Sequence, residues 1–320
     1  MILQFIPDKF VSIGAFVGIL FAFLATVIAT DKLCNFLPKD AGRDFAHDGK
    51  KSAGKPRGAG IIFVLAFVAA ALLFVPFTVE NLIYLVLIVI CMMTGFLDDA
   101  SKSPWGEYKK GFLDLCVAAL VAVTFLHFNS NVVELAMFDV TFTIHPVLFA
   151  VLTVILVWTS VNVTNCTDGV DGLSGTLTII SIMTIYLIDM MKNVAGEFSF
   201  MILLFAVCIL GYLWYNATPS RLMMGDAGSR AMGLFISIAI LKTGSPFLFI
   251  PVALVMILDG GLGILKVSLI RFLKIRIMKN VRTPLHDHVR KVWDWSNTQT
   301  VFRFAIIQII LAVATLYAIR

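Results

Sequence analysis

Apolar residues along this chain are gathered into blocks of about twenty, and short polar segments separate the blocks. A helix needs about 20 apolar residues to cross the hydrocarbon core of a bilayer, so each block predicts a membrane-spanning helix. The eighth block is short, and the ninth contains Asp259-Gly260-Gly261, where we expect a bend or a break. The pattern predicts about ten transmembrane helices, at residues 11–30, 58–77, 81–97, 111–128, 146–163, 172–190, 199–216, 230–242, 246–272 and 301–319.

The composition favours a membrane protein over a soluble one. Hydrophobic residues make up 59% of the 320 positions and charged residues only 14%, whereas a soluble domain carries roughly a quarter charged residues. The apolar blocks recur along the whole chain, which excludes a single cleaved leader as their source. We therefore expect an all-α polytopic membrane protein, with one integral membrane domain over residues 1–320.

The distribution of lysine and arginine predicts the orientation in the membrane. Residues 31–57, residues 98–110 and the loop after residue 272 are rich in Lys and Arg, and the alternate loops are nearly bare. Basic loops stay on the cytoplasmic side, so both termini are expected outside. The exterior segment 132–145 alternates in part between apolar and polar residues, and both a small β-hairpin and a structureless loop fit it.

The polar residues that are unusual for such an oily chain all fall on the predicted cytoplasmic side. Asp98-Asp99 end the third span, residues 162–172 join the fifth and sixth, residues 224–229 join the seventh and eighth, and residues 283–288 lie in the last cytoplasmic loop. Carboxylates and imidazoles from four separate loops thus converge on one face, which predicts a functional site there. Its loops lie at about 31–57, 98–110, 160–172, 216–230 and 273–300.

The paired acids at the end of the third span also have a purely structural interpretation, as a solvated helix end. The helix dipole disfavours carboxylates at a C-terminus, however, so Asp98 and Asp99 are expected to have a cation or a basic partner. Residues 162–172 could be turns in which Asp171 or Ser174 caps the next helix. Such turns do not require two Asn and two Asp at three-residue spacing, and we favour a functional interpretation.

The other two segments are equally open to a structural interpretation. Residues 225–229 could simply cap the eighth helix, or their glycines could let backbone N–H groups approach a phosphate while Asp226 holds a metal. His286 and His288 could be solvated loop histidines. Hard carboxylates with few cysteines suit magnesium rather than zinc. Together with nearby lysines, such a site predicts phosphoryl transfer between a diphosphate and a lipid.

Four motifs occur in a fixed order between the apolar helices. They read Asp98-Asp99, Asn162-x-x-Asn165-x-x-Asp168-Gly-x-Asp171-Gly, Met224-Gly-Asp226-x-Gly-Ser229 and Thr283-Pro-Leu-His286-x-His288. Together they resemble the polyprenyl-phosphate N-acetylhexosamine-1-phosphate transferases. The Thr-Pro-Leu-His segment is most similar to that of the phospho-MurNAc-pentapeptide transferases within this superfamily. The resemblance covers nearly the whole chain, including ten helices with both ends outside.

The resemblance implies transfer of phospho-MurNAc-pentapeptide from UDP-MurNAc-pentapeptide to undecaprenyl phosphate, giving lipid I and UMP, in peptidoglycan synthesis. It implies Mg²⁺ as the cofactor and a site that faces the cytoplasm from the bacterial inner membrane. The implied partners are these two substrates and the lipid bilayer, with no nucleic acid. A homodimer is compatible with the sequence, which does not determine the oligomeric state.

The resemblance also implies a role for each motif residue. Asp226 would contact magnesium, and Asp98 with Asp99 would serve the lipid phosphate as base or positioner. His286 would help to bind the sugar-phosphate portion. The implied catalytic residues are Asp98, Asp99, Asp226 and His286, and the implied substrate-binding residues are Lys102, Asn162, Asn165, Asp168, Asp171, Asn216, His288 and Lys51.

The sequence departs from the family pattern in two places. The family usually has three successive histidines followed by Phe-Glu, whereas residues 286–290 read His-Asp-His-Val-Arg, which puts any role of the middle histidine in doubt. The family's Thr-Pro-Thr-Met-Gly-Gly is replaced at residues 55–60 by Lys-Pro-Arg-Gly-Ala-Gly. Lys50, Lys51 and Lys55 therefore compete for the role of the family's lysine before that motif.

Two mechanisms and three other functions stay open at this stage. We prefer direct attack of the lipid phosphate on the sugar-bearing phosphorus over a double displacement through an aspartyl-phosphate on Asp98 or Asp99. The same superfamily includes enzymes that transfer GlcNAc-1-phosphate. A transporter with Asp259 on an ion path is an alternative from another class, although the remaining acids lie at the cytoplasmic ends. A purely structural scaffold would not need aspartates converging from four loops.

Overall fold

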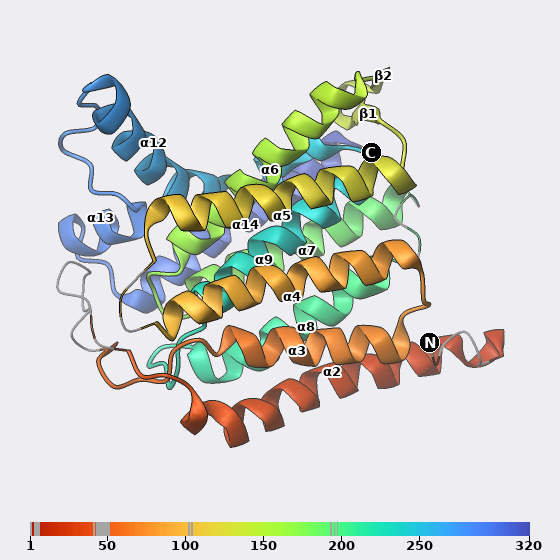
Figure 1. Cartoon of the computed structure of the whole chain (residues 1–320), viewed down its shortest axis with the longest axis horizontal. Helices are drawn as coiled ribbons and strands as arrows, with labels where there is room; N and C mark the ends of the chain where they lie inside the picture. The colour runs from red at the N-terminus through yellow and green to blue at the C-terminus, as the bar shows by residue number, and fades with distance from the viewer. Residues whose placement is uncertain are drawn as a thin grey trace.

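The computed structural model is a bundle of long, roughly parallel and antiparallel helices (Figure 1). It describes residues 2, 7–40, 42, 52–101, 103, 105–192, 194, 196 and 198–320. The long helices are α2 (Val11–Leu33), α3 (Gly60–Phe74), α4 (Val79–Asp99), α5 (Glu107–Phe128), α6 (Pro146–Thr167), α7 (Leu173–Lys192), α8 (Phe198–Asn216), α9 (Gly225–Lys242) and α14 (Asn297–Ala318). The short ones are α10 (Phe249–Val252), α11 (Leu254–Met256), η6 (Ile257–Gly261), α12 (Leu262–Ser268), η7 (Leu269–Leu273) and α13 (Leu285–Val292).

The prediction of a polytopic all-α membrane protein is confirmed. In the part of the chain that the structure describes, seven helices are long and apolar enough to cross a membrane. An eighth span results if Pro246–Val252 and Leu254–Leu273 are counted together, and these two are bent by 71°. The bend comes earlier than expected: the break is at Ala253, and Asp259-Gly260-Gly261 lies in the π-helical turn η6. The other two predicted spans correspond to α3 and α9, which are not among these eight: α3 is short, and α9 carries three charged residues.

The exterior segment is a β-hairpin, as one of its two interpretations predicted. Strands β1 (Val132–Leu135) and β2 (Val140–Thr143) pair antiparallel, with Val132 opposite Thr143. The backbone N–H of Glu134 donates to the carbonyl of Gly244 over 3.0 Å, so the hairpin is tied to the segment that follows α9. Figure 1 shows the hairpin and both chain ends at one end of the bundle.

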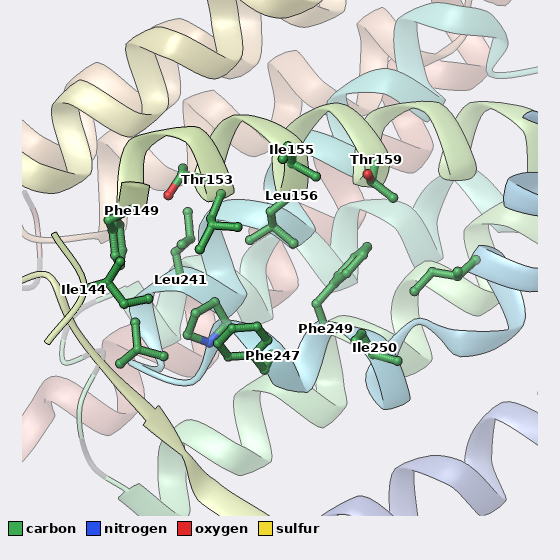
Figure 2. Close-up of a pocket in the computed structure, with 14 residues that line it drawn as sticks. Ile144, Phe149, Thr153, Ile155, Leu156, Thr159, Leu241, Phe247, Phe249 and Ile250 are labelled. Atoms are coloured by element: carbon green, nitrogen blue, oxygen red, sulfur yellow. The ribbon is translucent and has the colours of Figure 1, made fainter. Parts of the chain in front are cut away.

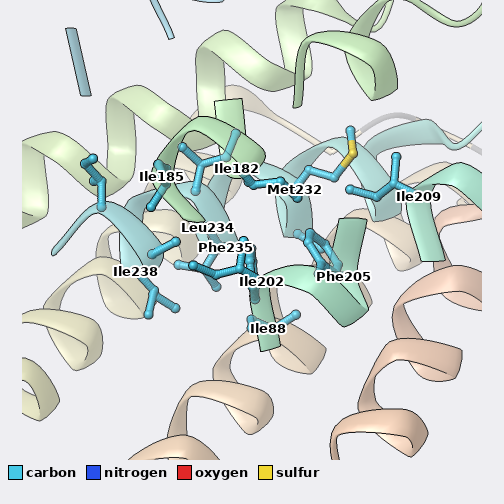
Figure 3. Close-up of a cluster of buried hydrophobic side chains, with 14 of the residues drawn as sticks. Ile88, Ile182, Ile185, Ile202, Phe205, Ile209, Met232, Leu234, Phe235 and Ile238 are labelled. Carbon is cyan, nitrogen blue, oxygen red and sulfur yellow. The ribbon is translucent and has the colours of Figure 1, made fainter. Parts of the chain in front are cut away.

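Helix α9 forms the centre of the bundle, which hydropathy alone did not predict. Sixteen of its residues are buried, because α3, α4, α6, α7 and α8 surround it. Glycines permit this packing. A Cβ on Gly60 of α3 would lie 2.0 Å from the Gly228 nitrogen, and one on Gly95 of α4 would lie 2.4 Å from the Asp226 carbonyl carbon. Isoleucine and phenylalanine side chains of α4, α7, α8 and α9 fill the remaining space (Figure 3).

Candidate active site

The acidic residues Asp98, Asp99 and Asp226 are neighbours at one end of the bundle. Asp98 and Asp99 end α4, and Asp226 lies in the first turn of α9. The backbone N–H of Ala227 donates to Asp99 Oδ2 over 3.4 Å. Asp99 therefore sits at the N-terminus of α9, where the helix dipole favours a carboxylate. Gly225 permits this approach, since it has φ +65° and a Cβ there would lie 2.1 Å from Asp99 Oδ2.

Two cations face this acidic cluster and neutralise part of its charge. Lys110 forms an ion pair with Asp98, and its Nζ lies 3.5 Å from Asp226 Oδ2. Arg57 Nη2 lies 2.8 Å from Asp99 Oδ1 and 3.7 Å from Asp226 Oδ1. The sequence predicted that the paired acids have a basic partner but not which one. Both residues were interpreted only as part of the basic loops, because a lysine or arginine that marks topology looks the same as one that binds an anion.

Arg57 remains charged in this setting. Burial by itself would lower its pKa, but the carboxylates of Asp99, Asp226 and Asp40 outweigh burial and raise the pKa above its ordinary value. Arg57 Nη1 lies 3.2 Å from Asp40 Oδ1. Asp40 is itself buried and accepts a hydrogen bond of 2.6 Å from Ser52 Oγ. The loop before α3 thus contributes a permanent positive charge to the site.

The α6–α7 connection lies beside the acidic cluster. Asn165 Nδ2 donates to Ser229 Oγ over 2.9 Å, which links α6 to the first turns of α9. Asp168 follows the last turn of α6 as its C-cap. Asp171 accepts from the Ser220 backbone N–H over 3.3 Å, and its carboxylate lies 3.8 Å from Lys55 Nζ. The structure therefore brings these predicted residues to the same end of the bundle as Asp226.

Two of the predicted substrate-binding asparagines are engaged by the chain itself. Asn216 is buried, accepts from the Gly172 N–H over 2.8 Å and donates to the Leu222 carbonyl over 2.8 Å. Asn162 donates to the Trp158 carbonyl of its own helix over 2.8 Å. Through its two contacts, Asn216 links the α6–α7 turn to the loop after α8.

His286 is held by Asp259, the aspartate that the transporter alternative would place on an ion path. His286 Nδ1 lies 2.8 Å from Asp259 Oδ2, and the His286 backbone N–H donates to Asp259 Oδ1 over 2.7 Å. Both side chains are almost fully buried, with 3% and 0% exposed. A Cβ on Gly169 would lie 2.2 Å from His286 Nε2, so the imidazole packs directly against the α6–α7 turn.

The remaining predicted residues have other partners or lie outside the described residues. His288 Nδ1 accepts from the Arg282 backbone N–H over 3.2 Å, and its ring packs edge-on against Trp293. Lys55 Nζ donates to Ser220 Oγ over 2.9 Å. Lys50, Lys51 and Lys102 lie outside the described residues.

The donor set fits a divalent cation that shares its ligands with a substrate. Among the described residues, no three His, Cys, Asp or Glu side chains form a complete metal site. Magnesium typically takes one or two carboxylates and completes its shell with water and substrate phosphate oxygens. Asp226 and Asp99 offer such a pair. Within the described part of the chain, the buried Asp99 Oδ1 accepts no well-aligned hydrogen bond, although Arg57 Nη2 lies nearby.

An apolar cavity of about 300 Å³ lies between α6 and the bent α10–η6 segment (Figure 2). Phe149, Leu156, Phe249 and Ile250 project into it, and Thr153 and Thr159 are the only polar side chains among the described residues that line it. It extends from the hairpin, at Val133, to Ile257, two residues before Asp259. The lining suits a hydrocarbon and offers nothing to a phosphate.

Known proteins of similar sequence carry a transferase name. The profile of glycosyl transferase family 4 matches residues 81–244. The phospho-N-acetylmuramoyl-pentapeptide-transferase of Treponema pallidum (strain Nichols) is 39% identical over 300 residues, which cover 88% of this chain and 82% of that protein. The enzyme of the same name from a Nitratiruptor species is 26% identical over 350 residues, covering 98% and 96%. The chain therefore belongs to the phospho-N-acetylmuramoyl-pentapeptide-transferase family, within glycosyl transferase family 4.

Proposed function

We propose that this protein transfers phospho-MurNAc-pentapeptide from UDP-MurNAc-pentapeptide to undecaprenyl phosphate, giving lipid I and UMP, with Mg²⁺ as cofactor. The observation that carries the proposal is the cluster of Asp98, Asp99 and Asp226 with Arg57 and Lys110. Opposed charges from four chain segments suit a metal-bridged diphosphate better than any uncharged ligand. We place this cluster at the cytoplasmic face of the bacterial inner membrane, because the loops that form it are the basic ones.

We propose a single displacement, in which an oxygen of the lipid phosphate attacks the sugar-bearing phosphorus and UMP departs. Asp226 and Asp99 would hold magnesium, which neutralises charge on the diphosphate. Lys110 and Arg57 bind and orient further phosphate oxygens. The double displacement fits less well. Asp99 is engaged by Arg57 and the end of α9, and Asp98 by Lys110 and the Trp105 backbone N–H, so neither carboxylate is poised as a nucleophile.

The lipid chain needs a dry path beside this site. We propose that the cavity between α6 and the α10–η6 segment holds part of the polyprenyl tail. Its apolar lining suits prenyl units, and it ends near Thr159 and Ile257, close in sequence to Asn162 and Asp259. A tail in this cavity would leave its phosphate at the end of the bundle where the acidic cluster lies.

The decisive experiment is UMP release by the purified protein. With UDP-MurNAc-pentapeptide, undecaprenyl phosphate and Mg²⁺, we expect UMP and a lipid-linked sugar, and neither product when EDTA replaces Mg²⁺. UDP-GlcNAc in place of the peptide-bearing substrate tests the GlcNAc-1-phosphate alternative. UMP release with UDP-GlcNAc but not with UDP-MurNAc-pentapeptide would assign the protein to that reaction. Phosphorylated enzyme isolated after incubation with nucleotide sugar, without lipid, would establish the double displacement.

The transporter alternative depends on Asp259, and the structure gives this residue another role. Its carboxylate accepts from both the ring and the backbone of His286, so it is engaged by a neighbour instead of facing an open path. Ion flux across proteoliposomes, in the absence of any lipid product, would support transport after all.

The contact between Asp259 and His286 leads to a prediction about positioning. Asp259→Asn should lower turnover about tenfold or more, because the imidazole loses the carboxylate that fixes its orientation. The double variant Asp259→Asn/His286→Ala should then be no worse than His286→Ala alone, since Asp259 acts through the histidine. Turnover numbers of the two single variants and the double variant, measured as UMP release, check this. Losses that multiply in the double variant would mean that Asp259 acts independently.

A further inference from the structure

Arg57 occupies a fixed position in the loop before α3. Its backbone N–H donates to the Pro38 carbonyl over 2.8 Å, and the residue forms a parallel bridge with Met223, just before α9. The neighbouring Pro56 accepts from the Met223 N–H over 2.8 Å. The backbone that carries the guanidinium is therefore fixed by hydrogen bonds to the segment before it and to the segment before α9.

The guanidinium lies where a metal ion would need the same oxygens. One nitrogen, Nη2, faces Oδ1 of both Asp99 and Asp226, at 2.8 Å and 3.7 Å. Those two carboxylates are the pair that could hold a divalent cation. A second cation placed between them would stand within a few ångströms of the arginine charge. Repulsion between like charges at such a separation weakens the binding of the second cation.

Among the described residues, Arg57 has one donor without a partner, and its side chain is 19% exposed. Its Nε is buried and donates no hydrogen bond within the part of the chain that the structure describes. A guanidinium presents its donors in a planar fork that matches phosphate oxygens. When a diphosphate arrives, the fork can bind phosphate oxygens while its charge is balanced by the incoming anion.

We propose that Arg57 is a tethered counter-ion that competes with the divalent cation for Asp99 and Asp226 and binds the diphosphate of the nucleotide. Arg57 then weakens metal binding to the free protein and strengthens nucleotide binding. The metal binds tightly only after the guanidinium has paired with the diphosphate and no longer occupies the carboxylates. The part that concerns the diphosphate rests on the proposed function, whereas the part that concerns the metal does not.

Two equilibrium measurements on the full-length protein in detergent test this, with Mn²⁺ as the metal probe and UDP as the diphosphate. In Arg57→Gln, we expect the Kd for Mn²⁺ without nucleotide to fall about tenfold or more, because the repelling charge is gone. The Kd for UDP without metal should rise about tenfold, because a charged fork is lost. Free Mn²⁺ is measured by electron paramagnetic resonance, and UDP binding by calorimetry. Opposite signs of the two changes are the signature, since a merely structural role would weaken both.

Two further variants make the test specific. Lys55→Gln removes the same charge two residues away, where the partners are Ser220 and Asp171, and should change the Kd for Mn²⁺ less than about threefold. Arg57→Lys keeps the charge without the fork, so it should keep the wild-type Kd for Mn²⁺ within about threefold and still weaken UDP binding. Arg57→Lys keeps the inference falsifiable even if Arg57→Gln is not recovered folded, because a tenfold change in its Kd for Mn²⁺ would contradict it.

The possible failures are distinguishable. Unchanged or weaker Mn²⁺ binding in Arg57→Gln, or Mn²⁺ binding in Arg57→Lys that differs from wild type by about tenfold, would overturn the inference. The Mn²⁺ titration contains neither nucleotide sugar nor lipid. Lack of UMP release from every nucleotide sugar would therefore overturn the proposed function and leave the metal result standing.

Discussion

Asp226→Asn should abolish turnover while leaving the protein folded. Asparagine has the same shape, but it removes the negative charge that faces both cations and that would hold magnesium. Charge stabilisation of this kind in phosphoryl transfer supports a loss of about a thousandfold or more. The fold should survive because each cation keeps another carboxylate: Lys110 keeps Asp98, and Arg57 keeps Asp99 and Asp40.

UMP release at saturating substrates and Mg²⁺ measures the loss, and thermal unfolding in detergent verifies the fold. A suitable control is Asp139→Asn at the tip of the hairpin. Asp139 has φ 51°, a conformation that asparagine adopts readily, and it lies at the far end of the bundle. The control should keep wild-type turnover. Near wild-type activity of Asp226→Asn at ordinary magnesium concentrations would rule out its assignment as the metal ligand.

Gly60→Ala should strongly destabilise the protein, although it adds only one methyl group. A Cβ at residue 60 would lie 2.0 Å from the nitrogen and 2.3 Å from the Cα of Gly228. Both are backbone atoms, so no side chain can rotate away, and α3 must separate from α9. That separation would also strain the hydrogen bonds from the Ala59 and Gly60 N–H groups to Met223 and Met224, each 3.0 Å. We expect a loss of about 3 kcal/mol, the upper end for overpacking.

The midpoint of thermal unfolding in detergent checks this prediction. The matched control is Gly111→Ala in α5, since in the described part of the chain a Cβ at that position meets no other helix within 4 Å. Because alanine favours a helix over glycine, the control should be unchanged or slightly more stable. If Gly60→Ala unfolds at the wild-type temperature, the contact between α3 and α9 is looser than the structure indicates. Any loss of activity in this variant should accompany the loss of stability, because the displaced turn carries Asp226.

The fold followed from the sequence wherever the bilayer imposes a local rule. Each crossing needs its own run of apolar residues, so α2, α4 and α14 could be predicted from single blocks. The hairpin was one of two interpretations of residues 132–145, because alternation over so few residues also fits a loop. The burial of α9 could not be predicted, since the sequence showed only that its apolar block, residues 230–242, is short, and α9 also carries the charged residues Asp226, Arg230 and Lys242. Its partners satisfy these charges: Arg230, for example, forms an ion pair with Asp114 of α5.

The sequence predicted the acidic residues of the candidate site but did not identify the two cations that pair with them. Asp98, Asp99 and Asp226 could be placed at one end because the distribution of Lys and Arg puts the loops that carry them on the same side of the membrane. Lys110 and Arg57 could not be singled out, because each lies more than a hundred residues from Asp226 in the sequence. Asp259 was noticed only as an acid inside a span. Its partner His286 lies 27 residues away, across a bend whose direction no local pattern predicts.

The sequence by itself determined that the chain is a polytopic helical membrane protein, which loops gather at one end and which acidic residues lie among them. These follow from hydropathy and charge, which each segment must satisfy on its own in a bilayer. Only the tertiary structure decided which cation meets which carboxylate, that Asp259 orients His286, and that Asn216 is engaged by backbone. These contacts depend on how closely two backbones approach, and glycines such as Gly60, Gly95 and Gly225 set that approach between segments far apart in the chain.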